Sequence, residues 1–148
     1  MMEILRANIN HLDEFVSLFE QYRAFYKADE DYEAAYSFIK ARLTEDDSVI
    51  FIALDFNKKG MGFVQLYPAF SSVGMKKLWL LNDLFVDNKY RKLGLAKQLM
   101  EMAKHHAVKS QSQGLKLATQ VENLAAKSLY EKLGYKKITA FDHYVLKL

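Results

Sequence analysis

The chain has 148 residues, the size of one domain with a sizeable core, and its 51% hydrophobic and 26% charged residues are ordinary for a globular protein. It contains no cysteine, which excludes a disulfide framework, a thiolate metal site and a catalytic thiol. A net charge of +3 is too small to predict nucleic-acid binding. The chain has no apolar run of membrane-spanning length and no signal-peptide pattern. We therefore expect one cytoplasmic domain over residues 1–148 that binds neither nucleic acid nor a membrane.

The N-terminal half predicts a strand, two helices and a hairpin. In chain order the expected elements are a strand at 2–7, a helix from about 8 to 26, a helix at 31–43, and strands at 48–55 and 61–67. Asn8 or Asn10 can cap the first helix, and a turn at 57–60 joins the two hairpin strands. Pro68 is expected to end the second hairpin strand, because proline cannot donate to a sheet ladder.

The C-terminal half alternates strands with helices. The expected elements are a strand at 78–86, a helix from 93 to about 110, a strand at 115–121, a helix at 124–133, and short strands at 136–139 and 141–146. Gly134 is expected to end the fourth helix in a left-handed conformation. Hairpin strands followed by strand–helix–strand crossovers predict an α/β fold, with a mixed, mostly antiparallel sheet and helices on both faces.

The segment from Leu81 to Lys97 is an apolar strand, a basic turn and the start of a helix. The first N–H groups of a helix have no partner within it, and the helix dipole places partial positive charge there. A phosphate fits this position, where Arg91, Lys92 and Lys97 would add full charges and Gly94 would let the backbone approach the ligand. A glycine in an ordinary tight turn before a solvated basic helix start is the alternative explanation.

Aromatic residues gather where the first two helices meet. They are Tyr22, Phe25, Tyr26, Tyr32 and Tyr36. A binding cleft and a helix–helix core explain this cluster equally well. In the first case, Tyr22, Tyr26, Tyr32 and Tyr67 would form a pocket for a cation together with the acidic run 29–31.

Two motifs and the order of elements resemble the GNAT superfamily of acyl-CoA-dependent N-acyltransferases. Arg91-x-x-Gly94-x-Ala96 after an apolar strand is similar to the family's pyrophosphate loop, [Q/R]-x-x-G-x-[G/A]. Asn123, Ala126 and the run from Leu129 to Tyr135 resemble the family's N…A…LYEKLGF signature. The resemblance extends over essentially the whole chain.

The resemblance implies that acetyl-CoA lies in a V-shaped opening where the strands at 78–86 and 115–121 splay apart. Backbone groups of Leu84, Phe85 and Val86 would bind the pantetheine arm and polarise the thioester carbonyl. Asn123 would hydrogen-bond the pantetheine, and Tyr130 would lie near the thioester sulfur and protonate the leaving thiolate. The pyrophosphate would rest on the loop made of Arg91, Lys92, Leu93, Gly94, Leu95, Ala96 and Lys97.

The general base is less well defined by the sequence. Asp83 is a carboxylate in an otherwise apolar strand, and burying it unpaired would be costly. It can bind or deprotonate a cationic amine, or it can be a structural hydrogen-bond acceptor. Asn82 and Asp83 can both face the acceptor only if a bulge interrupts the alternation of the strand. Polyamine-specific members of the family often carry Glu where Asn82 stands, and Glu122, Asp142 or an ordered water are alternative bases.

The sequence thus predicts an acetyl-CoA-dependent N-acetyltransferase, in which a small primary amine such as a polyamine, amino acid or aminoglycoside attacks directly in a ternary complex. Asn82, Asp83, Tyr26 and Tyr67 are the expected acceptor-binding residues. A protein lysine or N-terminus is an alternative acceptor, and a non-catalytic acyl-CoA-binding regulatory module is the alternative class of protein. The four histidines lack a metal-ligand pattern, so no metal is expected. The edge of the last strand can form a homodimer.

Overall fold

The computed structural model describes residues 2–148, which form two compact units, one ending at Leu117 and one running from Ala118 to Leu148. The first unit is an open five-stranded sheet in the order β1-β2-β3-β4-β5, antiparallel except for the parallel pair β4–β5. Its strands are β1 (Glu3–Arg6), β2 (Val49–Leu54), β3 (Gly60–Ser71), β4 (Lys76–Val86) and β5 (Leu115–Lys116). The prediction of a mixed, mostly antiparallel α/β sheet is confirmed.

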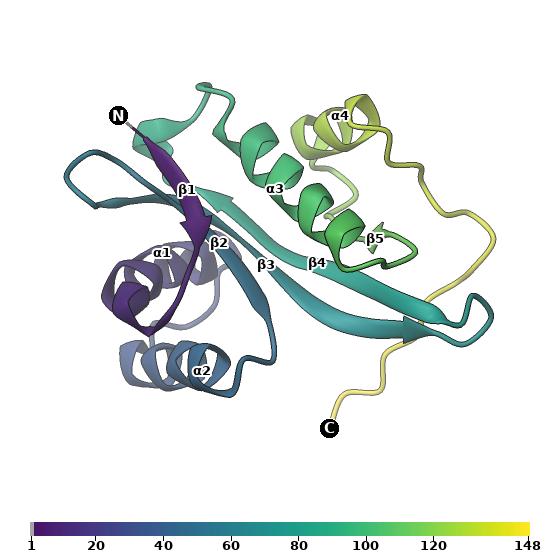
Figure 1. Cartoon of the computed structure of the whole chain (residues 1–148), viewed down its shortest axis with the longest axis horizontal. Coiled ribbons are helices and arrows are strands. Elements are labelled where there is room, and N and C mark those ends of the chain that lie inside the picture. Colours follow the sequence, from purple (N-terminus) through teal and green to yellow (C-terminus); the bar gives the residue numbers. More distant parts are fainter. Residues whose placement is uncertain (1) are drawn as a thin grey trace. The chain divides into compact units, whose positions relative to one another are not determined.

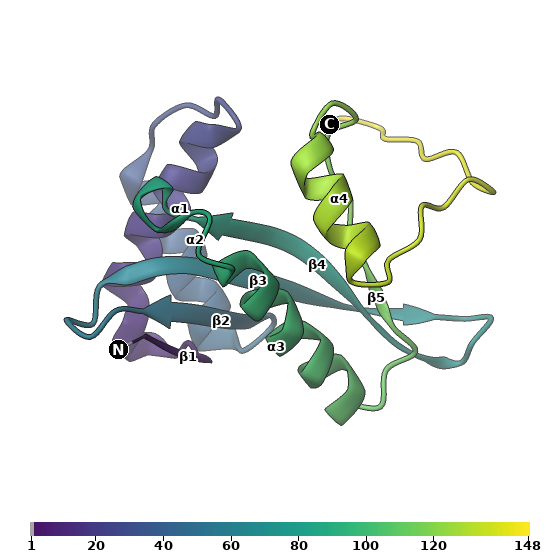
Figure 2. The same cartoon turned by 90° about the horizontal axis from the view of Figure 1, so that it is seen from above.

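Helices cover both faces of this sheet (Figures 1 and 2). The helices α1 (Leu12–Phe25) and α2 (Tyr32–Glu45) lie on one face, and α3 (Leu95–Lys109) lies on the other. A 3₁₀ turn, η1 (Ile9–His11), precedes α1, and Asn8 caps it by accepting a hydrogen bond from the Asn10 N–H at 2.9 Å. Asp31 caps α2 by accepting from the Ala34 N–H at 3.1 Å. These caps satisfy helix-terminal N–H groups that have no partner within the helix.

The core between the sheet and the first two helices is aromatic. Phe15 of α1 is fully buried and packs on Phe63 of β3, with 4.7 Å between ring centroids. Tyr22 packs edge-on against Phe63 and Phe85, which ties the end of α1 to the middle of the sheet. Fully burying one such ring stabilises the fold by roughly 1.5–3 kcal/mol. Part of the aromatic cluster expected at the α1–α2 junction is therefore core.

β3 continues through Pro68 to Ser71, so the prediction that Pro68 ends this strand is wrong. β2 pairs with β3 only as far as Leu66, and beyond that residue β3 pairs with β4 alone. Pro68 pairs with Trp79 on that one side. The N–H that proline lacks would face the side of β3 that no longer pairs with β2, so the sheet loses no hydrogen bond.

The strand expected at 115–121 is only two residues long, because β5 ends at Lys116. The second unit contains α4 (Leu124–Lys132), close to the expected helix, and Gly134 beyond it has φ +94° as expected. The strands expected at 136–139 and 141–146 do not form, and residues 135–148 contain no regular element. Alternating apolar residues specify a strand only where a partner edge pairs with them. The strand edge on which the expected homodimer relied is therefore absent from these residues.

The close approach of β3 to β4 depends on Gly62. A Cβ atom at this position would lie 2.7 Å from the Phe85 carbonyl oxygen and 3.2 Å from the Val86 Cα. Because these are backbone atoms, Gly62→Ala should force the strands apart and lower the free energy of unfolding by about 1–3 kcal/mol. Urea denaturation measures this change. Gly114→Ala is the matched control, since a Cβ there meets nothing within 4 Å; equal losses in the two variants would contradict the explanation.

Candidate active site

The loop between β4 and α3 has two residues in the left-handed region. Lys92 has φ +65°, and Gly94, which precedes α3, has φ +77°. Such backbone turns aim consecutive N–H groups into a shallow concavity that attracts anions. Within residues 2–148 no side chain caps the start of α3, so its first N–H groups stay available. Arg91, Lys92 and Lys97 are all exposed around this point. The loop therefore has the backbone and the charge to hold a phosphate.

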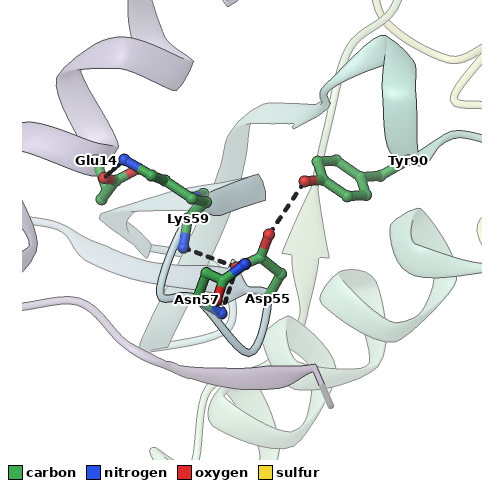
Figure 3. Close-up of polar contacts among 6 residues, drawn as sticks. Glu14, Asp55, Asn57, Lys59 and Tyr90 are labelled. Atoms are coloured by element: carbon green, nitrogen blue, oxygen red, sulfur yellow. Dashed lines mark hydrogen bonds and ion pairs between the residues drawn. The ribbon is translucent and has the colours of Figure 1, made fainter.

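A hydrogen-bond network holds the start of this loop on the β2–β3 turn (Figure 3). The Tyr90 hydroxyl donates to Asp55 Oδ2 at 3.2 Å, and Tyr90 ends η2 (Asn88–Tyr90), the 3₁₀ turn that follows β4. Asp55 Oδ1 also accepts from the N–H groups of Asn57 at 2.8 Å and Lys59 at 3.0 Å. The Lys59 N–H bond is the main cause that lowers the pKa of Asp55, although partial desolvation opposes it.

Arg91 folds back onto the end of β4. Its Nε donates to the Val86 carbonyl at 3.1 Å, and its guanidinium lies 5.8 Å from the ring centroids of both Phe25 and Phe85. The arginine thus fixes the loop to the sheet and to the end of α1 through a hydrogen bond and cation–π contacts.

One edge of β4 is free along its second half. β5 pairs with β4 only at Trp79 and Leu80. From Leu81 to Val86, that edge has no strand partner among the described residues. Leu84 and Phe85 lie in this stretch, where Phe85 points its side chain into the core.

A bulge interrupts β4 at Asn82. Gln65 pairs with Asp83 and Leu66 with Leu81, which leaves Asn82 as an extra residue on β4. Asn82 Nδ2 consequently donates to Asp83 Oδ1 at 3.0 Å, so the two side chains lie together. The bulge that both residues need in order to serve one site is therefore present.

Asp83 is buried, with 4% of its surface exposed, and it accepts hydrogen bonds from neutral groups. Gln65 Nε2 donates to Oδ2 at 2.6 Å, opposite the bond from Asn82. Among the described residues no basic side chain forms an ion pair with Asp83. Burying a carboxylate costs less free energy when a cation pairs with it, so this position favours a cationic ligand.

Two phenols lie close to this carboxylate. Burial and then the charge of Asp83 raise the pKa of Tyr67 to about 12, and the same two causes raise the pKa of Tyr22 well above its ordinary value. Both phenols therefore keep their protons at neutral pH. Tyr26 contacts Tyr22 with 5.0 Å between ring centroids, and it is 44% exposed. The structure brings Asn82, Asp83 and Tyr67 into one neighbourhood, with Tyr26 at its outer side.

The remaining predicted residues belong to the second unit. Asn123 accepts a hydrogen bond from the Ala126 N–H at 3.2 Å and so caps α4. Tyr130 lies in α4, and its ring centroid is 6.1 Å from that of Tyr135. The alternative bases Glu122 and Asp142 are exposed residues of this unit.

Sequence reasoning missed Gln65 and Ser48, and it missed the link between Tyr90 and Asp55. Gln65 is fully buried, and the Ser48 Oγ donates to its Oε1 at 3.1 Å. The available signal was a lone amide in the apolar run 61–67, opposite the lone carboxylate of the next strand. His106, by contrast, packs on Trp79 at 4.9 Å between ring centroids, which agrees with a packing role.

A basic loop with left-handed residues, a strand edge without a partner among the described residues and a buried carboxylate on that strand agree with the class of acyl-CoA-dependent acyltransferases. Residues 12–135 match the family model described as Acetyltransferase (GNAT) family. The chain belongs to the GNAT family, and it is an acetyl-CoA-dependent N-acetyltransferase.

Individual relatives agree with this assignment. An uncharacterized N-acetyltransferase of Bacillus subtilis is 43% identical over 147 residues, covering 99% of this chain and 98% of the relative. The crystal structure of a probable acetyltransferase is 35% identical with a TM-score of 0.93, covering 99% of this chain and 97% of that one. An aminoglycoside N-acetyltransferase in complex with CoA has the same fold at 21% identity, with a TM-score of 0.83 and coverage of 100% and 96%.

No helix within residues 2–148 has the length and apolarity to cross a membrane. Nor do three or more His, Asp or Glu side chains of these residues gather in an arrangement for a metal ion.

The contact between Tyr90 and Asp55 should weaken in acid. Because the folded-state pKa of Asp55 is lowered, its stabilising effect is present above the ordinary carboxyl value of 3.8 and is lost as pH falls through the folded pKa. Amide hydrogen exchange of residues 88–91, corrected for intrinsic rates, should therefore accelerate as the pH falls below 3.8. Asp55→Asn should make this local exchange independent of pH, and an unchanged acid response in the variant would contradict the assignment.

Proposed function

We propose that the enzyme transfers acetyl from acetyl-CoA to the primary amine of a small cationic molecule, by direct attack in a ternary complex within one domain over residues 1–148. The observation that carries this proposal is Asp83, a buried carboxylate held by neutral donors beside the free edge of β4. An amine that enters as an ammonium ion would supply the missing positive charge.

The cofactor-binding part of the proposal uses the loop and the strand. The pyrophosphate of acetyl-CoA is bound by the N–H groups between Lys92 and Lys97, and Arg91 holds the loop in place. Backbone groups of Leu84, Phe85 and Val86 bind the pantetheine arm and the thioester carbonyl. This assignment is supported by the left-handed residues of the loop and by the free strand edge. Asn123 is assigned to the pantetheine from its motif.

The reaction joins the amine nitrogen to the thioester carbonyl carbon and breaks the carbon–sulfur bond. An alkyl amine has a pKa of about 10.4, so only one molecule in roughly 10³–10⁴ is neutral at pH 7. Asp83 binds the ammonium ion and accepts its proton, directly or through water. Tyr130 donates a proton to the leaving thiolate, because a phenol with a pKa of about 10 still holds its proton at neutral pH.

The acceptor is proposed to be a small molecule. Asn82, Tyr67 and Tyr26 surround the carboxylate with amide and aromatic groups, which suit an amine on a polar or cyclic framework. The similar fold of an aminoglycoside N-acetyltransferase is consistent with this class of acceptor.

The first experiment measures thiol release from acetyl-CoA with a panel of amines, and it follows CoA binding separately. The panel contains polyamines, amino acids, aminoglycosides and lysine peptides. Turnover confined to small cationic amines supports the proposal. Turnover only on peptides would replace the acceptor class, CoA binding without turnover would favour a regulatory module, and no CoA binding would overturn the cofactor assignment.

Tyr130→Phe should lower kcat by about 10²-fold or more, which is the usual contribution of a general acid, while the CoA dissociation constant stays nearly unchanged. Steady-state kinetics with the best amine and calorimetric titration with CoA measure the two quantities. Tyr144→Phe is the matched control, because Tyr144 is an exposed tyrosine of the same unit. An unchanged kcat across the pH range would remove Tyr130 from this role.

Asp83→Asn should lower kcat/KM for cationic amines by about 10²-fold or more, because the variant removes both the negative charge and the proton acceptor. CoA binding should be retained. Asp13→Asn removes one exposed carboxylate from α1 and controls for net charge. If both variants keep wild-type kcat/KM, the role of Asp83 is wrong.

A further inference from the structure

A chain of side-chain hydrogen bonds crosses the sheet and ends at Asp83. Ser48, just before β2, donates from Oγ to Gln65 Oε1 at 3.1 Å, and Gln65 Nε2 donates to Asp83 Oδ2 at 2.6 Å. All three residues are buried, with exposed fractions of 6%, 0% and 4% in that order. Buried polar groups of this kind keep fixed partners, because an unmade hydrogen bond there costs about 1–3 kcal/mol.

The chain has a direction. A carboxamide presents an acceptor at one end and a donor at the other, and either orientation fits the same volume. The Ser48 hydroxyl donates to the acceptor end of Gln65, and the NH₂ group at the other end donates to Asp83. The reversed amide would set its oxygen against the carboxylate and leave its NH₂ facing the serine hydroxyl. Because a hydroxyl can donate or accept, the acceptor-only carboxylate of Asp83 sets the orientation of the amide, and Ser48 anchors its other end.

The bulge completes the arrangement from the opposite side. Asn82 Nδ2 holds Oδ1 of Asp83 while Gln65 holds Oδ2, so each oxygen has its own amide donor. Two amides on opposite oxygens fix the plane of the carboxylate. A carboxylate has about four acceptor sites, so directions remain for a further donor. The amide donors are neutral, and the charge of Asp83 therefore stays available to a ligand.

We infer that Gln65 and Ser48 are positioning residues for acetyl transfer, which fix the direction in which Asp83 presents its carboxylate to the acceptor amine. This inference depends on the proposed function of Asp83. Neither residue is assigned a contact with the substrate. Gln65 acts through Asp83, and Ser48 acts through Gln65.

The groups that face Asp83 do not titrate near neutral pH. Tyr22 approaches from α1 and Tyr67 from β3, and both phenols are half-buried and have raised pKa values. Arg42 of α2 and Asp47 act on Tyr67, and these two residues form an ion pair at 2.7 Å. A change in the acid limb of the pH profile on substitution of Gln65 would therefore come from the carboxylate site itself.

The kinetic test compares four variants with the best amine of the panel. Gln65→Met removes the donor at similar volume and should lower kcat about 10²-fold, as expected for a misdirected catalytic group, without weakening CoA binding. Gln65→Glu places two carboxylates within hydrogen-bond distance, where both cannot be ionised, so the acid limb of kcat/KM should move to higher pH. Ser48→Ala should lower kcat, and Ser48→Thr, which keeps the hydroxyl, should restore it.

Leu66→Met is the matched control. Leu66 is the next residue of β3 and is also fully buried, but its side chain points to the other face of the sheet. A volume-conserving exchange there tests general damage to the strand. The inference is overturned if this control loses as much kcat as Gln65→Met, or if Gln65→Glu has a wild-type pH profile.

A second readout needs no activity. In the free protein the Gln65 side-chain amide should give one pair of ¹H–¹⁵N signals, and Ser48→Ala should shift or broaden them because the Oε1 end of the amide loses its partner. The ¹³C signal of the Asp83 carboxyl should change position in Gln65→Met, because Oδ2 loses its amide donor. If no amine is turned over, the proposed function fails, and these spectra still decide the positioning chain. Unchanged amide and carboxyl signals in both variants would overturn it.

Discussion

The ladder between β3 and β4 is the constraint on which the rest of the structure depends. It joins the two long strands from Gly62–Val86 to Ser71–Lys76, and each face of these strands supports helices. β4 also carries Asn82 and Asp83 of the candidate site. From Leu81 to Val86 one of its edges has no strand partner among the described residues, its bulge brings Asn82 and Asp83 together, and its end leads into the basic loop before α3. A shift of β4 by one residue would send Asp83 to the other face and displace the loop together with it.

The bulge at Asn82 solves a packing problem. A regular strand would place consecutive side chains on opposite faces, so only one of two polar neighbours could serve the site. The extra residue lets Asn82 and Asp83 lie together while Phe85 still reaches the core. A cationic side chain in place of the two neutral amide donors would have neutralised the charge of the carboxylate. Amide donors stabilise the charge without cancelling it, and such fixed dipoles need little reorganisation when a substrate binds.

The sequence predicted those features that depend on local pattern. Helical spacing located α1, α2 and α4, and the glycine at 134 marked the left-handed residue beyond the last helix. What it missed depends on partners distant in sequence. Pro68 stays in its strand because β2 has already ended on that side. β5 is only as long as its pairing with β4, which stops at Lys116. Gln65 and Asp83 became a pair only through the register of the hairpin, which one sequence does not display.

The residues proposed to bind the two substrates are linked by one connected set of contacts. Arg91 hydrogen-bonds the last carbonyl of β4, and its guanidinium rests on Phe85 of that strand and on Phe25 at the end of α1. Tyr26 follows Phe25 and packs on Tyr22, the phenol beside Asp83. A short path of ring contacts therefore connects the loop between β4 and α3 to the surroundings of the carboxylate. Tyr90 and Asp55 hold the same loop from the side of the β2–β3 turn, so its position is set at two points that are far apart in the sequence. The distance between the thioester and the acceptor amine then depends on rigid elements of the sheet, which is the condition for holding two reactants in an attacking geometry.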